Sequence, residues 1–180
     1  GHMKQFSTTF DGDVFKDPRT CLTIASWEKH CSENLEFVVL CLRHPASVAL
    51  SLQRRDNIKI EAGLRLWLRY NQSLLNGISK TPLIVTDYDQ LEFGFASELA
   101  RLTAALGVRM SKKKICMQAD DFYSANLNHA RTAEIEAIGL PVEIASLYQE
   151  LRSLASASNR KNESNKSLWQ PLSGLLHRRT

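Results

Sequence analysis

A cationic side chain and two hydroxyls cluster where an apolar segment meets a proline. Arg43 follows the apolar run 37–42, and Pro45 comes two positions later. Proline is favoured in the first turn of a helix, where the N–H that it lacks would have no partner. The free amides of such a turn, its positive dipole end and a guanidinium all favour bound anions. Because Ser47 and Ser51 are four residues apart and share a helix face, the pattern predicts a phosphate-binding junction.

The same residues also fit an ordinary strand-to-helix turn that carries an exposed arginine and no ligand. The six residues 37–42 are apolar without alternation, which is typical of a strand covered on both faces of a parallel sheet. We therefore expect residues 37–43 to form a buried strand whatever the role of Arg43.

The expected elements alternate in a way that indicates a parallel α/β fold. We predict strands near residues 12–16, 37–43 and 82–88. Leucines and aromatic residues at helical spacing predict helices at 46–55, 59–78, 95–106 and 132–155, with a short one near 22–32. Strands separated by long helices favour right-handed crossovers and a three-layer arrangement of helices on a parallel sheet.

Length and composition indicate one soluble globular domain. The chain has 180 residues, of which 43% are hydrophobic and 23% charged. No apolar run approaches the roughly 20 residues that span a bilayer, so we expect no membrane insertion. The four cysteines have no metal-ligand spacing, and we expect reduced, largely buried thiols in a cytoplasmic protein. We expect residues 1–3 to be a cloning scar, residues 4–155 to form the domain and residues 156–180 to be a polar, flexible tail.

The charge of the chain is mildly positive. A net charge of +4 suits an anionic nucleotide, but 19 acidic residues interrupt any broad basic surface. We therefore expect no nucleic-acid binding, which requires such a surface. The basic run 112–114 is interpreted as a solvated loop.

Three segments, in order along the chain, resemble the PAPS-dependent sulfotransferases, which use 3′-phosphoadenosine 5′-phosphosulfate (PAPS). Arg43, Pro45 and Ser51 resemble the segment of these enzymes that binds the 3′-phosphate. Upstream, residues 14–19 are similar to the strand end that precedes this segment in bacterial and carbohydrate-type members. Downstream, residues 82–91 resemble the family strand that ends in a tyrosine, an acidic residue and a leucine. The resemblance implies a partial sulfotransferase fold, with the P-loop-NTPase-like sheet of that family.

The resemblance also implies roles for individual residues. Arg43 and Ser51 would bind the 3′-phosphate, Tyr88 would lie near the adenine, and Arg131 would be a further basic contact to the nucleotide. Tyr88 could equally be a hydrogen-bonded core tyrosine. The implied reaction transfers a sulfuryl group from PAPS to a hydroxyl or amine of a carbohydrate or small-molecule acceptor, and it needs no metal.

Lys16 and Asp17 are the candidate catalytic residues at the upstream strand end. In related enzymes this strand end faces the acceptor, so Lys16 would stabilise charge on the transferring or leaving group and Asp17 would act as a base. A structural alternative is that Asp17 caps the next helix and pairs with Arg19. Pro18 stands about where the more common histidine base of the family would fall.

One part of the family pattern has no counterpart in the sequence. Nothing fits the loop that holds the 5′-phosphosulfate, and there is no glycine-rich lysine motif. We therefore expect an additional N-terminal portion of the same domain as a partner, without which the chain could be inactive. Two alternatives remain: a fragment of a P-loop-like kinase or nucleotide hydrolase, and a non-catalytic α/β module of a larger protein.

Overall fold

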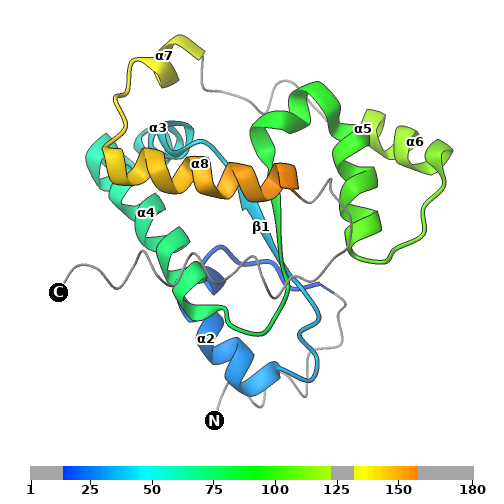
Figure 1. The fold of residues 1–180 in the computed structure, drawn as a ribbon. Helices are drawn as coiled ribbons and strands as arrows, with labels where there is room; N and C mark the ends of the chain where they lie inside the picture. Colours follow the sequence, from blue (N-terminus) through cyan, green and yellow to red (C-terminus); the bar gives the residue numbers. More distant parts are fainter. Residues whose placement is uncertain (1–13, 123–131, 158–180) are drawn as a thin grey trace.

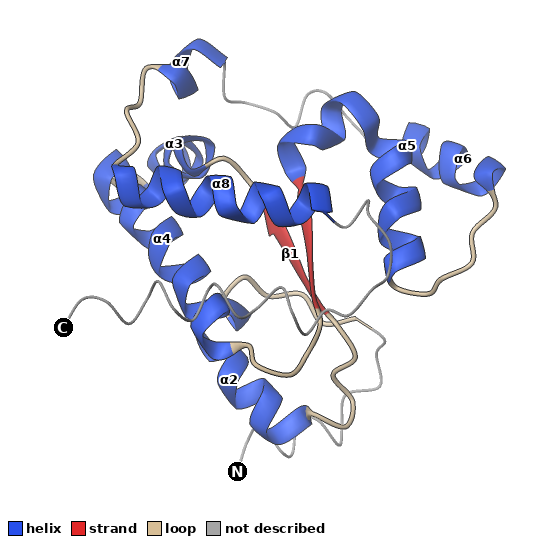
Figure 2. Ribbon diagram, in the orientation of Figure 1, coloured by secondary structure: helices blue, strands red, loops and turns tan. Residues whose placement is uncertain are grey.

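The computed structural model describes residues 14–122 and 132–157. It is a mixed α/β structure in which helices predominate and two parallel strands form a small sheet (Figure 2). The elements, in chain order, are α2 (Thr20–Cys31), β1 (Val38–Leu42), α3 (Pro45–Asp56), α4 (Ile60–Gly77), β2 (Leu83–Asp87), α5 (Tyr88–Ala105), α6 (Lys112–Phe122), α7 (Thr132–Glu136) and α8 (Val142–Ala157). None of the helices in the described ranges has the length and apolar character needed to cross a bilayer.

The two strands run parallel and in register. Val38 pairs with Leu83 at one end of the ladder, and Leu42 pairs with Asp87 at the other. Parallel strands need a long crossover connection, which α3 and α4 provide here. The residues that directly follow the strands therefore meet at one edge of the sheet.

One face of the sheet carries the hydrophobic core. Leu40 and its ladder partner Val85 lie on this face and are buried with Leu42. Figure 1 shows α8 lying across the strands, with α2, α3 and α4 to one side and α5 and α6 to the other. The core residues from these helices are Ile24, Ala49, Leu64, Trp67, Leu74, Ile144, Tyr148 and Leu151.

The other face of β1 is open, contrary to the expectation of a strand covered on both sides. Val39 is 42% exposed, and Cys41 is also exposed. On that face α5 covers the β2 side, where the Arg101 guanidinium donates to the Val85 carbonyl at 2.7 Å. All four cysteines are free thiols, but Cys116 is exposed as well, so the expectation of largely buried thiols is wrong.

The helix and strand predictions near β1, α3, α4 and β2 are confirmed to within about two residues. The predicted strand at 12–16 is wrong over its described part, because residues 14–16 have no strand pairing. The predicted loop at 112–114 is the first turn of α6. Residues 156 and 157 of the predicted tail belong to α8, and the rest of the predicted tail, residues 158–180, lies outside the described ranges.

Two predicted helices have different boundaries in the structure. The helix expected from Phe95 begins at Tyr88, because the Asp87 carboxylate caps it by accepting from the Asp89 N–H at 3.1 Å. Gly94 (φ −163°, ψ 45°) interrupts the helical dihedral angles within α5. The helix expected at 132–155 is divided into α7 and α8. Pro141 lies immediately before α8, and proline disfavours helical geometry at the residue before it.

The crossing of α3 and α4 depends on a glycine. A Cβ added at Gly63 would lie 2.9 Å from the Ala49 Cα and 3.0 Å from its Cβ. Ala49 is fully buried, so its backbone has little room to move. The close approach therefore allows α4 to pack directly on α3.

Gly63→Ala is expected to lower the free energy of unfolding by about 1–3 kcal/mol, because overpacking against backbone outweighs the better helix propensity of alanine. Gly139→Ala is the matched control, since a Cβ there meets nothing within 4 Å. Chemical denaturation of both variants measures the difference. Equal stability of Gly63→Ala and the parent chain would contradict the packing argument.

Glu28 is a buried carboxylate that holds the loop preceding β2. It accepts from the backbone N–H groups of Ser79, Lys80 and Thr81 at 2.8–2.9 Å and from the Ser79 hydroxyl at 2.6 Å. Burial by itself would raise the pKa of Glu28, but these donors lower it from 4.5 to about 2. Helix α2 is therefore tied to the entry of β2 by an ionised carboxylate.

Glu28→Gln is expected to reduce stability at pH 7 by about 2 kcal/mol, because the amide nitrogen cannot accept from the backbone donors. The folded-state pKa of Glu28 is depressed, so its contribution is complete above pH 4.5 and is lost as pH falls toward about 2. The stability difference between the parent and Glu28→Gln should therefore shrink over that interval in denaturation measurements. Glu36→Gln, at an exposed position, is the control and should change little. A pH-independent difference would contradict this account.

Candidate functional site

Polar and charged side chains gather where β1 and β2 end. Arg43 and His44 follow β1, while Asp87 ends β2 and Tyr88 and Asp89 follow it. The ladder pairs Leu42 with Asp87, so the two groups are neighbours in space. In open α/β sheets, ligands bind outside the carboxyl ends of the strands, which makes this edge the candidate site.

Arg43 contributes a cation with unused hydrogen-bonding capacity. Its Nε is buried and has no hydrogen-bond partner within the described residues. The guanidinium carbon lies 5.0 Å from the centroid of the Tyr88 ring, in cation–π geometry. The Trp67 indole N–H donates to the Arg43 carbonyl at 3.0 Å and thus fixes the backbone at the strand end. The arginine is held on a rigid support, and its side chain retains a free donor.

His44 connects β1, α3 and the end of β2. Its backbone N–H donates to the Asp89 Oδ2 at 2.8 Å, and its Nδ1 accepts from the Ala46 N–H at 3.2 Å. The second bond caps α3, which has the predicted proline at its first position. The imidazole ring meets Tyr148 edge-on, with the ring centroids 4.9 Å apart. His44 is therefore a half-buried residue that caps α3.

Helix α8 closes the cluster with Tyr148 and Arg152. The Tyr148 hydroxyl donates to the Asp89 Oδ2 at 3.4 Å, and the Arg152 Nε donates to the Asp87 Oδ2 at 3.1 Å. Asp87 is 5% exposed and uses its other oxygen to cap α5. The carboxylates of Asp87 and Asp89 thus accept hydrogen bonds from the β1–α3 junction, from α5 and from α8.

The surroundings shift the pKa values of these groups. Burial raises the pKa of Asp89, and the neighbouring Asp87 charge adds to this rise, which the His44 N–H partly offsets. Burial also raises the pKa of Tyr148, with the two carboxylates acting in the same direction. For His44, burial lowers the pKa, and this outweighs the opposing effect of Asp89. The site therefore favours a neutral imidazole and makes Asp89 easier to protonate than an exposed aspartate.

The structure brings together two of the residues predicted for the nucleotide site. Arg43 and Tyr88 are in contact. Ser51 lies on α3 and is exposed, and no interaction within the described residues joins it to Arg43. Ser47, on the same helix, is buried. Arg131 lies outside the described residues.

The candidate catalytic residues lie on the segment before α2. Lys16 is exposed. Burial raises the pKa of the Cys41 thiol, and the Lys16 charge partly opposes this rise, which places Lys16 near β1. The Asp17 carboxylate accepts from the Arg19 backbone N–H at 2.8 Å and forms an ion pair with its guanidinium at 2.6 Å. This pairing lowers the pKa of Asp17 from 3.8 to about 2. The predicted pairing of Asp17 with Arg19 is therefore confirmed. The predicted capping of the next helix by Asp17 is not, because Arg19 is the N-cap residue of α2.

Five members of the cluster had no role in the sequence-based prediction. These are His44, Asp87, Asp89, Tyr148 and Arg152. For Asp87 and Asp89, the available signal in the sequence is the presence of two carboxylates at the end of a predicted strand. The other signal is the four-residue spacing of Tyr148 and Arg152, which places both on one face of a helix. Periodicity does not show which strand that face meets.

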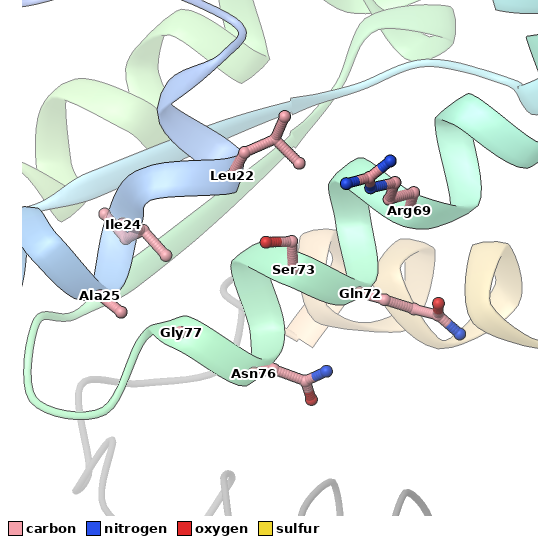
Figure 3. A pocket seen from close by; sticks show the side chains of 8 residues that line it. All are labelled: Leu22, Ile24, Ala25, Arg69, Gln72, Ser73, Asn76 and Gly77. Atoms are coloured by element: carbon pink, nitrogen blue, oxygen red, sulfur yellow. The ribbon is translucent and has the colours of Figure 1, made fainter.

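A separate pocket lies between α2 and α4. It has a volume of about 420 Å³ and is bordered by Leu22, Ile24, Ala25, Arg69, Gln72, Ser73, Asn76 and Gly77 (Figure 3). Arg69, Gln72 and Asn76 come from α4 in this view, while Leu22 comes from α2. The pocket shares no residue with the strand-end cluster.

The His44 imidazole is expected to titrate with a midpoint below 6.5, because burial lowers its pKa. A depressed histidine pKa means that the protonated form opposes folding, so the native structure loses stability as pH falls below about 6.5. Following the Cε1–H signal of His44 by NMR measures the midpoint, and His44→Asn identifies the signal. A midpoint at or above 6.5 would show that His44 is not the neutral acceptor of the Ala46 N–H.

The described residues contain no group of three or more His, Cys, Asp or Glu side chains placed to hold a metal ion. Comparison with protein-family models, with curated proteins and with solved structures finds no match to the chain.

Proposed function

We propose that the chain is part of a PAPS-dependent sulfotransferase and that the strand-end cluster binds the 3′-phosphate of the nucleotide. The observation that carries this proposal is the Arg43 side chain. It stands at the carboxyl end of a parallel strand and at the start of a helix, with a buried Nε that has no partner in the described structure. A phosphate oxygen would supply the missing acceptor through a charge-assisted hydrogen bond.

Tyr88 supports the same assignment. Its ring already lies against the Arg43 guanidinium, which restricts the arginine to one side of the junction. The aromatic face also offers a surface for the adenine of the nucleotide. In this proposal Ser51, exposed on α3, and Arg131 contribute further polar contacts to the nucleotide.

The reaction proposed for the complete domain is sulfuryl transfer to a hydroxyl or amine acceptor, such as a carbohydrate or small molecule. It resembles phosphoryl transfer, in which positioning and stabilisation of charge on oxygen atoms dominate. Cationic side chains can provide that charge without a metal. Lys16 is the stronger candidate for the acceptor side, because the ion pair with Arg19 makes Asp17 a weak base.

The open face of β1 supports the proposed N-terminal portion of the domain. Val39 and Cys41 are exposed although they belong to an uninterrupted apolar strand. Further strands beside β1 would extend the sheet toward the three-layer, P-loop-NTPase-like architecture, and a helix packed on this face would cover Val39 and Cys41. The additional N-terminal portion would also supply the missing 5′-phosphosulfate loop.

Arg43→Ala is expected to weaken binding of 3′-phosphoadenosine 5′-phosphate at least tenfold, since each charge-assisted hydrogen bond is worth about 1.5–3 kcal/mol. Isothermal titration calorimetry of the full chain measures this affinity. Arg65→Ala removes an exposed arginine of α4 and serves as the matched control. Equal affinity of Arg43→Ala and the parent chain would exclude the proposed phosphate site.

A parallel titration with ATP and Mg²⁺ separates the alternatives. A kinase or nucleotide hydrolase fragment should prefer ATP with magnesium, whereas the proposed sulfotransferase should prefer the nucleotide with a 3′-phosphate. A non-catalytic module should bind neither.

A further inference from the structure

We propose that Asp89 is an internal anion that competes with the nucleotide phosphate for the β1–α3 junction and thereby controls its affinity. The inference rests on the proposed function and concerns the regulation of the same site. Its basis is the His44 backbone N–H, which points from the strand end and already donates to the Asp89 Oδ2 at 2.8 Å. A ligand phosphate at this junction would therefore meet the Asp89 carboxylate, which already occupies the backbone N–H of His44.

The internal bonds leave few free donors at the start of α3. The Ala46 N–H donates to His44 Nδ1, and Pro45 has no N–H. With the His44 amide bonded to Asp89, the Arg43 Nε is a donor that still lacks a partner among the described residues. The negative charge of Asp89 is also close enough to Arg43 for the arginine to act on its pKa. An entering dianion must therefore overcome repulsion from Asp89 or displace it from the amide.

The charged and titratable neighbours of Asp89 come from every element packed around it. Arg43 and His44 face it from the β1–α3 junction, and Asp87 from the end of β2. From α8, the Tyr148 hydroxyl donates to Asp89, while Arg152 pairs with Asp87. Arg152 is thus already neutralised, and His44 favours its neutral form. A phosphate at the junction would meet two carboxylates and one cation, Arg43, that forms no ion pair within the described residues.

Protonation of Asp89 removes this repulsion. Its pKa is raised from 3.8 by burial and by Asp87, so protonation occurs at a higher pH than for an exposed aspartate. A neutral Asp89 also accepts more weakly from the His44 amide, which becomes available to the ligand. The junction should therefore bind anions more tightly as pH falls.

The test is calorimetric titration of 3′-phosphoadenosine 5′-phosphate into the parent chain and Asp89→Asn between pH 7.5 and pH 5. At pH 7.5 the variant should bind about tenfold more tightly, because a full negative charge beside the phosphate is gone. The affinity ratio should decrease as pH falls, since the pKa of Asp89 is raised and a growing share of Asp89 in the parent is neutral. Protonation of the ligand phosphate at about pH 6 also weakens the repulsion, and the titration of Asp89→Asn over the same pH range gives the ligand's own pH dependence. Glu61→Gln, which removes an exposed first-turn carboxylate of α4, should leave the affinity unchanged.

A second measurement does not depend on the folding of the variant. In the parent chain, nucleotide binding should shift the ¹H–¹⁵N signal of the His44 amide, because its bond to Asp89 is replaced. If the parent binds the nucleotide but Asp89→Asn binds no more tightly, or if the His44 amide does not respond, the inference is wrong and the proposed function stands. If neither protein binds the nucleotide at any pH tested, the proposed function fails and the inference fails with it.

Discussion

The parallel pairing of β1 with β2 is the constraint on which the site depends. The ladder pairs Leu42 with Asp87, so the carboxyl ends of β1 and β2 lie side by side at one edge of the sheet. Arg43 then meets Tyr88, and the His44 amide meets Asp89. A shift of one residue in this register would move Asp87 from the face shared with α8 to the opposite face. The close packing of α3 on α4 maintains the alignment, because these helices form the crossover between the strands.

Carboxylates are the second feature common to the fold and the site. Glu28 and Asp87 are both buried, and each is stabilised by several donors from other elements. Removing a carboxylate from water is unfavourable unless such donors replace the solvent. Asp89 is less completely satisfied than Glu28: it receives one short bond from the His44 amide and one long bond from Tyr148. This difference explains why the pKa of Glu28 is lowered whereas that of Asp89 is raised.

Local sequence patterns predicted the elements near the site but not its composition. The apolar run before Arg43 and the proline after it indicated β1 and the start of α3, and both are present. The strand expected near Lys16 failed because strand formation requires a pairing partner, which periodicity cannot show. Tyr148 and Arg152 lie about sixty residues from the carboxylates that they contact, so no local pattern could assign them. Glu28 was missed for the same reason, since its partners are about fifty residues away.

The two interpretations of Arg43 differ in what they expect of its side chain. An arginine that merely ends a strand would place its guanidinium in water, where every N–H finds a partner. Here the Nε is buried without a partner in the described structure, which destabilises the folded chain by about 1–3 kcal/mol. The aromatic ring of Tyr88 and the anchored carbonyl of Arg43 hold the side chain in this position. An anion bound at the junction would satisfy the donor and remove the penalty, which is what the proposed phosphate site requires of Arg43.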